Sequence, residues 1–214
     1  MNQWTWAALP AVPTGVVGLA VRHQLARLTY RREHETALPS PGPRWWIPLL
    51  IAASMAGLVA RYGTAELWPW LLPTAPLAIF GPWLAAIDLD VQRLPDKLLL
   101  PMAVIVSMAV IAITILTSDP ALAGRAFAGG LASLAGHWIL HRASRRGLGY
   151  GDIKLAGTLG IATSSINLTT LWWSLMIGAS AAAIWSLATQ RRSHFAYGPW
   201  LIAGALTATT LLAP

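Results

Sequence analysis

The chain has 214 residues, of which 56% are hydrophobic and only 11% are charged. About a quarter of the residues in a typical soluble domain are charged, so this composition excludes an ordinary water-soluble protein and indicates one embedded in lipid. Cysteine is absent, which excludes disulfides, thiolate metal sites and a cysteine nucleophile. The net charge of +7 does not indicate a nucleic-acid partner, because basic loops are its usual source in a membrane protein.

Eight apolar stretches follow one another along the chain, at residues 5–21, 45–61, 67–87, 98–117, 121–140, 153–165, 168–188 and 197–213. Several reach the ~20 residues that a helix needs to cross ~30 Å of hydrocarbon, whereas 153–165 is too short and 5–21 is marginal. Backbone polar groups in lipid must pair within their own segment, so each stretch is predicted to be helical. We therefore expect an all-α, polytopic transmembrane protein of about eight helices, with six or seven as alternatives.

Basic residues are concentrated in alternate connections between these stretches. Thirteen of the 15 Lys and Arg residues lie in or beside residues 22–44, 88–97, 141–154 and 189–196. Cytoplasmic loops carry an excess of Lys and Arg, so these four connections are predicted to be cytoplasmic, with both termini on the other side. The basic loop 22–44 is too small for a domain of its own and is expected to touch anionic lipid. We divide the chain into N-terminal helices (1–65) and a membrane core (66–214).

Acidic residues are few, and half of the eight fall at predicted cytoplasmic helix ends: Asp88, Asp90, Asp96 and Asp152. Carboxylates near hydrocarbon are costly and tend to mark function. Each also has a structural explanation: in "GLGYGDIKLAG" (147–157), Asp152 could cap a helix, with Gly149 and Gly151 permitting a tight turn. Asp88 could likewise be a helix terminus, and Asp96 a turn residue.

Two of these aspartates are predicted to lie on the same membrane face. Asp88 belongs to "AAIDLDVQRLPDKLLLP" (85–101), and Asp152 follows 64 residues later. Two carboxylates that meet at one water molecule share a proton, because like charges at short range do not both ionise readily. The ionised member then acts as a base on water and the protonated member as an acid towards a scissile carbonyl. The pair therefore favours aspartyl protease chemistry.

Three segments resemble the type IV prepilin peptidases, the bacterial branch of the Gly-x-Gly-Asp intramembrane aspartyl proteases. "IDLDVQRLPDKLLLP" and "GLGYGDIKLAGTLG" are similar to the two aspartate boxes of that family, and "AYGPWLIAG" (196–204) to the Gly-Pro segment that opens its last helix. The resemblance implies catalytic roles for Asp88 and Asp152, and no role for Asp90. It implies substrate-binding or structural roles for Gly149, Gly151, Lys154, Asp96, Pro95, Gly198 and Pro199.

The same resemblance implies a substrate and a location. Its substrates are prepilin or pseudopilin precursors, in which a short basic leader ending in Gly precedes an apolar helix, and they are cut on the cytoplasmic side of the inner membrane. The distribution of basic residues independently places both aspartates on that side. Many family members carry two Cys-x-x-Cys pairs that are associated with zinc and N-methylation. This chain has no cysteine, so we expect a peptidase without metal or cofactor, and the methyltransferase activity is not implied.

Other interpretations remain open at this point. An inactive membrane scaffold is not supported by the sequence, since both aspartates are present. A transporter using Asp88 and Asp152 as a proton or cation site usually has its acids near mid-membrane, whereas these gather at one face. A presenilin-type or signal-peptide-peptidase-type protease would need a Tyr-Asp first box and a Pro-Ala-Leu segment, which are not found in place. No feature indicates an oligomeric state.

Two histidines have a spacing that suits a metal ion. His137 and His141 are four residues apart, so they share one face of a predicted helix. Because no third ligand is evident nearby in the sequence, we expect them instead to form a polar face at the membrane interface.

Overall fold

The computed structural model describes residues 11–64, 66–144, 148–189 and 196–212. These residues form eight α-helices and no strand: α2 (Ala11–Ala26), α3 (Trp46–Tyr62), α4 (Leu71–Val91), α5 (Asp96–Thr117), α6 (Pro120–Ala143), α7 (Tyr150–Ile166), α8 (Leu168–Thr189) and α9 (Gly198–Thr207). A π-helical turn, Ala208–Leu212, continues α9, and short 3-10 turns occur at Glu33–Glu35 and Trp68–Trp70. The predicted all-α class is confirmed, and every predicted apolar segment overlaps one helix.

Three of these helices are long and apolar enough to cross a membrane: Trp68–Val91, Asp96–Thr117 and Leu168–Thr189. Two shorter apolar helices, Trp46–Tyr62 and Gly198–Leu212, accompany them. Of the three long helices, α4 is the most enclosed, with 61% of its apolar window buried against 17% for α8. The protein is therefore a polytopic helical membrane protein with α4 near its centre and α8 on its lipid-facing margin.

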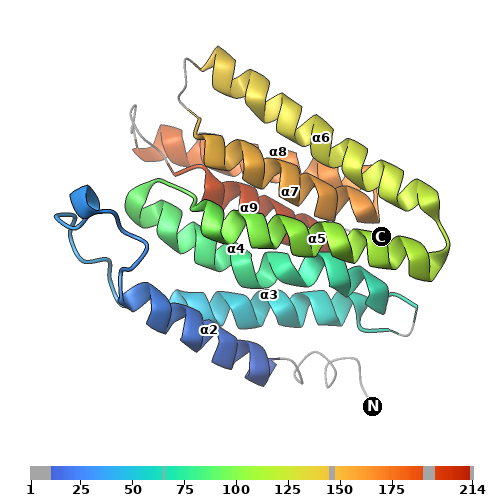
Figure 1. Ribbon diagram of the computed structural model, residues 1–214, viewed down its shortest axis with the longest axis horizontal. Coiled ribbons are helices and arrows are strands. Elements are labelled where there is room, and N and C mark those ends of the chain that lie inside the picture. Colours follow the sequence, from blue (N-terminus) through green and yellow to red (C-terminus); the bar gives the residue numbers. More distant parts are fainter. Residues whose placement is uncertain (1–10, 65, 145–147, 190–195, 213–214) are drawn as a thin grey trace.

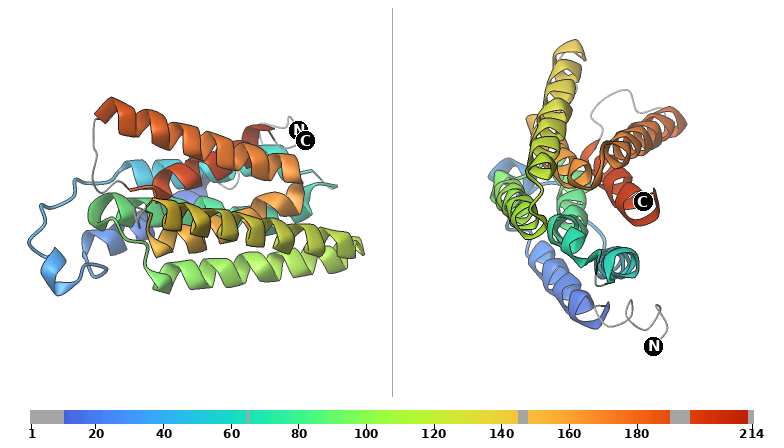
Figure 2. Two further views of the ribbon diagram at one scale, coloured as in Figure 1. Left: turned by 90° about the horizontal axis from the view of Figure 1, so that it is seen from above. Right: turned by 90° about the vertical axis from the view of Figure 1, so that its right-hand side faces the viewer.

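The helices lie side by side in an up-and-down bundle (Figures 1 and 2). Helices α2, α4 and α6 end, and α7 and α9 begin, at one end of the bundle, on the left in Figure 1. We call it the basic end, because these residues belong to the helix ends and connections there: Arg31, Arg32, Arg44, Arg93, Lys97, Arg142 and Lys154. The alternation of loops expected from the sequence is thus present in the fold.

The central core joins five helices. Buried residues of α3, α4, α5, α7 and α9 form one cluster, which includes Leu58, Leu84, Met102, Leu155 and Leu201. Against it, α6 packs closely on α7 through small residues. A Cβ placed on Gly160 would lie 3.0 Å from the Cα of Gly130, so neither helix tolerates a larger residue there. Small residues allow this close approach of helices in membranes.

Arg125 lies within α6, inside a segment that the sequence assigns to the membrane. Its guanidinium donates hydrogen bonds to the carbonyl oxygens of Ser164 (3.0 Å) and Ser165 (2.8 Å). These carbonyls belong to the last turn of α7, where no intrahelical donor remains for them. The cation therefore satisfies the end of a neighbouring helix, which explains how it is accommodated.

Candidate active site

Asp88 lies in the last turn of α4 and is buried, with 4% of its surface exposed. Its Oδ2 accepts a hydrogen bond of 3.1 Å from the backbone N–H of Gly198, the first residue of α9. A Cβ on Gly198 would lie 2.9 Å from that same oxygen, so glycine is required for this approach. Pro199 follows in the first turn of α9, where its missing N–H costs nothing. The Gly-Pro segment thus places a backbone donor on the Asp88 carboxylate.

Asp152 is the third residue of α7 and is also buried. Its Oδ2 accepts a hydrogen bond of 3.1 Å from the N–H of Gly149, the N-cap residue, so part of its role is indeed to cap the helix. Its Oδ1 is buried and has no hydrogen-bond partner among the described residues. A buried polar atom without a partner is destabilising. The capping role therefore accounts for only one of the two oxygens of Asp152.

Leu94, in the connection between α4 and α5, contacts residues next to both aspartates. A Cβ on Gly151 would lie 2.8 Å from the Cβ of Leu94, and one on Gly198 would lie 3.3 Å from its Cδ1. The side chain of Leu94 therefore fits between the start of α7 and the start of α9. Asp88, which is bonded to Gly198, and Asp152, which follows Gly151, therefore both lie next to residues that contact this one side chain. The structure brings together the two carboxylates that the sequence paired.

The remaining predicted site residues surround this point. Asp96 is the first residue of α5, and its Oδ1 lies 2.7 Å from Nζ of Lys154 in the second turn of α7. Both side chains are more than half exposed, and such a pair contributes about 0–1 kcal/mol, so it orients the two helices more than it stabilises them. Pro95 is the extended N-cap residue of α5. The functional roles of these residues stay predictions.

The expectation for the two histidines is wrong. His137 and His141 are both buried, with 5% and 4% exposed, rather than forming a polar interfacial face. Nδ1 of His137 lies 2.8 Å from the carbonyl oxygen of Ser133, and its ring packs against Tyr197. The ring of His141 packs against Tyr150. Aromatic residues that open α7 and α9 cover both imidazoles, a contact that helical spacing does not reveal.

Asp90, to which the sequence assigned no role, is the centre of a buried ion cluster. Its carboxylate lies 2.7 Å from Nη2 of Arg31 and 3.3 Å from Nη2 of Arg44, and it accepts a hydrogen bond from the hydroxyl of Tyr30. Residues two apart on a helix point about 200° apart, so Asp90 faces segment 27–45 while Asp88 faces α9. Tyr30 and Arg31 are 60 and 59 residues from Asp90 along the chain, and Arg44 is also distant, which is why no local pattern predicted the cluster.

A second ion pair anchors the same segment. Nη2 of Arg93 lies 3.0 Å from Oε2 of Glu35 and also donates to the carbonyl oxygen of Tyr30. Burial opposes ionisation of Glu35, but the hydrogen bonds from Arg93 and from the Arg32 backbone outweigh it and hold the pKa of that carboxyl below its ordinary value. Segment 27–45 is therefore held at two points, by Asp90 in the last turn of α4 and by Arg93 just after that helix ends. Much of its positive charge is neutralised within the protein.

Among the described residues, no group of three or more His, Cys, Asp or Glu side chains is arranged to hold a metal ion. Two buried carboxylates from different helices, each held through one oxygen by a backbone N–H, are placed for acid–base work on a water molecule.

Comparisons with known proteins identify the family of the chain. Residues 75–190 match the type IV leader peptidase family, and this range includes both aspartates. Three curated proteins, each named prepilin leader peptidase/N-methyltransferase, are similar: that of Dickeya chrysanthemi is 32% identical over 175 residues (76% of this chain, 59% of the relative). That of Escherichia coli K12 is 31% identical over 127 residues (58% and 56%), and that of Neisseria gonorrhoeae 32% over 160 residues (71% and 52%).

The chain thus spans between about half and three fifths of the length of these relatives. No solved structure matches it. The family match nevertheless covers more than half of the chain, including most of α4, all of α7 and the segment that joins them in sequence. The chain belongs to the type IV leader peptidase family.

Proposed function

We propose that the chain is a membrane aspartyl endopeptidase that removes the short basic leader from prepilin-like or pseudopilin-like precursors. The observation that carries this proposal is the convergence of Asp88 and Asp152, two buried carboxylates from α4 and α7, at one end of the bundle. Membership of the leader peptidase family supports the reaction class. The names of the relatives support prepilin precursors as substrates.

The hydrogen bonds of the two carboxylates suit this reaction. In each, Oδ2 is held by a backbone N–H, from Gly198 or from Gly149, so the other oxygen is left for the reaction. The ionised carboxylate takes a proton from water as the water oxygen attacks the scissile carbonyl carbon. The protonated carboxylate gives its proton to the carbonyl oxygen. As the resulting diol collapses, the second carboxylate takes back a proton from one of its hydroxyls, the C–N bond breaks, and the proton held by the first carboxylate passes to the leaving nitrogen.

We place the reaction at the cytoplasmic face of the inner membrane. The site lies at the basic end of the bundle, and positively charged connections normally stay in the cytoplasm. A substrate helix would approach through the lipid and unwind near Gly149 and Gly151, two residues without a side chain at the start of α7. The leader would then extend into water at the same end.

We assign the reaction to the membrane core, residues 66–214, and a supporting role to residues 1–65. Both aspartates, Leu94 and Gly198 fall within the core. The N-terminal part contributes segment 27–45, which forms ion pairs with α4 at Asp90 rather than at Asp88. The relatives also carry N-methyltransferase in their names, but the chain has no cysteine with which to form the associated motif. We therefore propose cleavage without methylation, and no metal or cofactor.

The test is co-expression of the full chain with a tagged prepilin in a cell that lacks its own peptidase. Leader removal is followed by gel shift, and the mass of the new N-terminus reports methylation. We expect processing by the wild type and none by Asp88→Ala or Asp152→Ala, with an unmethylated product. If several prepilins stay uncut although the chain is folded in the membrane, the peptidase proposal fails and a scaffold or transporter role takes its place.

A further inference from the structure

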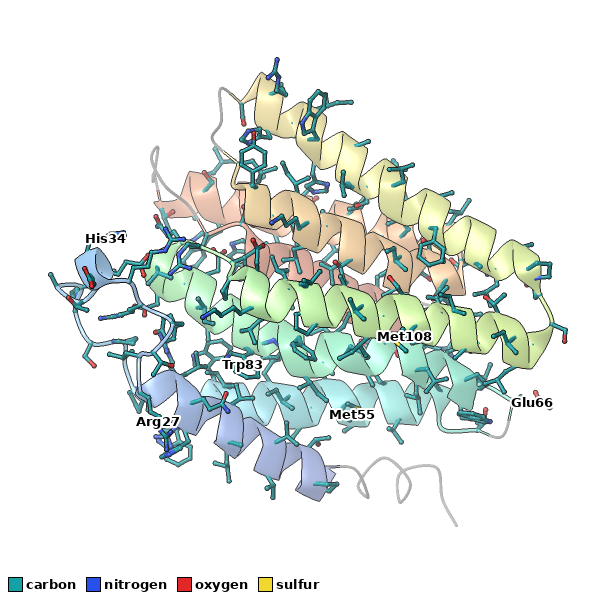
Figure 3. The ribbon with its side chains drawn as sticks, in the orientation of Figure 1. Arg27, His34, Met55, Glu66, Trp83 and Met108 are labelled. Carbon is teal, nitrogen blue, oxygen red and sulfur yellow. The ribbon has the colours of Figure 1, made fainter. Side chains whose placement is uncertain are left out.

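A cavity lies at the basic end, apart from the candidate active site. It is bounded by α2, α4 and α5, and neither Asp88 nor Asp152 lines it. Its volume is about 670 Å³. One wall is apolar and is formed by Leu25, Trp83 and Leu98, one residue from each helix. Figure 3 marks Trp83 on the side of α4 that faces the space between α5 and α2. The indole also stacks on Phe80, one turn deeper in α4.

The lining of the cavity also has a cationic part. Four basic side chains form it: Arg31, Arg32, Arg93 and Lys97. A single acidic residue, Asp96, lines the cavity with them. Four cations and one carboxylate in one cavity attract an anion, unless other acids neutralise the cations from outside.

Two of the four cations are neutralised in this way. Arg31 is paired with Asp90, and Arg93 with Glu35. The carboxylate of Asp96 is itself engaged by Lys154, 2.7 Å away, so it offers little to the cavity.

Arg32 and Lys97 are the two that remain. Their side chains are exposed, and neither forms an ion pair with any described residue. They come from segment 27–45 and from the first turn of α5, so two parts of the chain that are distant in sequence present uncompensated charge to one space. The cavity is therefore complementary to an anion that both cations can contact at once.

The apolar wall selects the kind of anion. The cations lie at the helix ends, where a membrane protein meets the lipid headgroups, and the apolar residues continue along the helices into the span. A free phosphate would satisfy the cations but leave the partly exposed side chains of Trp83 and Leu98 uncovered. We propose that this cavity binds one anionic phospholipid, with the phosphate between Arg32 and Lys97 and an acyl chain along Trp83 and Leu98. This proposal does not depend on the peptidase activity.

A bound lipid at this point would touch the connection that carries Leu94. Pro95 and Asp96 line the cavity directly, and Ile87 precedes Asp88 in α4. The lipid would therefore contact the start of α5 directly. The expected consequence is a more stable chain in anionic than in zwitterionic lipid.

The experiment uses the full purified chain in a neutral detergent, with lipid binding measured by native mass spectrometry. The probe is phosphatidylglycerol, compared with phosphatidylcholine and with inorganic phosphate. The pocket variant is Arg32→Gln with Lys97→Gln. The matched control is Arg27→Gln with Arg142→Gln, which removes two exposed cations from the same end of the bundle but outside the cavity. Circular dichroism and a thermal melt establish that both variants are folded.

We expect one phosphatidylglycerol to bind the wild type and the control alike, and to bind the pocket variant roughly 30-fold more weakly, as the loss of two cations near the surface implies. Phosphatidylcholine should bind more weakly than phosphatidylglycerol, and millimolar phosphate should not displace the lipid. Equal affinity of the pocket variant and the control would overturn the proposal. Displacement by phosphate alone would overturn the lipid assignment in favour of a free-phosphate site.

Discussion

Gly198 donates its backbone N–H to the carboxylate of Asp88 across 110 residues of sequence, at 3.1 Å. The first residue of the last helix therefore fixes the orientation of a carboxylate carried by α4. No side chain fits in this contact, because a Cβ on Gly198 would meet the carboxylate oxygen at 2.9 Å and Leu94 at 3.3 Å. The position of Asp88 consequently depends on the presence of glycine at the start of α9.

Replacement of Gly198 by alanine should displace Asp88. A misplacement of about 1 Å at a reacting group can cost roughly 10²-fold in rate, so we expect a loss of that order in leader removal, mainly in kcat. The matched control is Gly136→Ala in α6, where a Cβ meets nothing within 4 Å. Cleavage of a purified precursor by both variants checks the prediction. If Gly198→Ala and Gly136→Ala cleave equally well, the contact does not position Asp88.

The ion cluster of Asp90 should matter for stability. Asp90→Asn leaves Arg31 buried, with 3% of its side chain exposed, and without its counter-charge. The substitution removes the carboxylate that faces both Arg31 and Arg44, so we expect a clear fall in melting temperature. Asp96→Asn breaks the exposed pair with Lys154 and should cost no more than about 1 kcal/mol. Equal melting temperatures for these two variants would show that the Asp90 cluster contributes no more to stability than the exposed ion pair does.

Glu35 should make stability depend on pH. Its pKa in the folded protein is lower than the ordinary 4.5, so its contribution is fully present above that ordinary value and is lost as the pH falls through the folded pKa. The melting temperature of the wild type should therefore exceed that of Glu35→Gln at neutral pH, and the gap should shrink in acid. When Arg93→Gln is also present, the difference in melting temperature that Glu35→Gln causes at neutral pH should be much smaller. A gap that widened as the pH fell would have the wrong sign for this account.

The absence of native cysteine makes the orientation easy to measure with single cysteines. Ser118→Cys lies after α5 at one end of the bundle, and Ser144→Cys after α6 at the basic end. An impermeant maleimide added to intact cells should label Cys at 118, and should label Cys at 144 only after the membrane is opened. The reverse pattern would place the carboxyl pair outside the cytoplasm and contradict the proposed site of cleavage.

Much of the helical architecture could be predicted from the sequence, because in lipid an apolar stretch has no alternative to pairing its own backbone. The spacing of Arg and Lys predicted which helix ends lie together. The pairing of Asp88 with Asp152 followed from their helix-end positions and from the resemblance to one family. These inferences use local composition and order, which a single sequence contains.

Contacts between distant side chains could not be predicted in this way. The partners of Asp90 come from segment 27–45, and the rings that bury His137 and His141 come from the starts of α9 and α7. Likewise, the position of Arg125 in the second turn of α6 is explained only by the end of α7 that lies beside it. Each of these depends on the relative rotation and tilt of packed helices, which hydropathy alone does not specify.

The central claim is that Asp88 and Asp152 act together on water. The most direct test is cleavage of a purified prepilin in proteoliposomes by the full chain and by Asp88→Asn and Asp152→Asn, which keep the size of the side chain. Asp119→Asn, which alters only the cap of α6, is the control. We predict that each site variant loses at least about 10³-fold in rate, as expected when an essential acid or base is removed, while the control cleaves like the wild type. Cleavage by Asp152→Asn within a few-fold of the wild type would contradict the aspartyl pair.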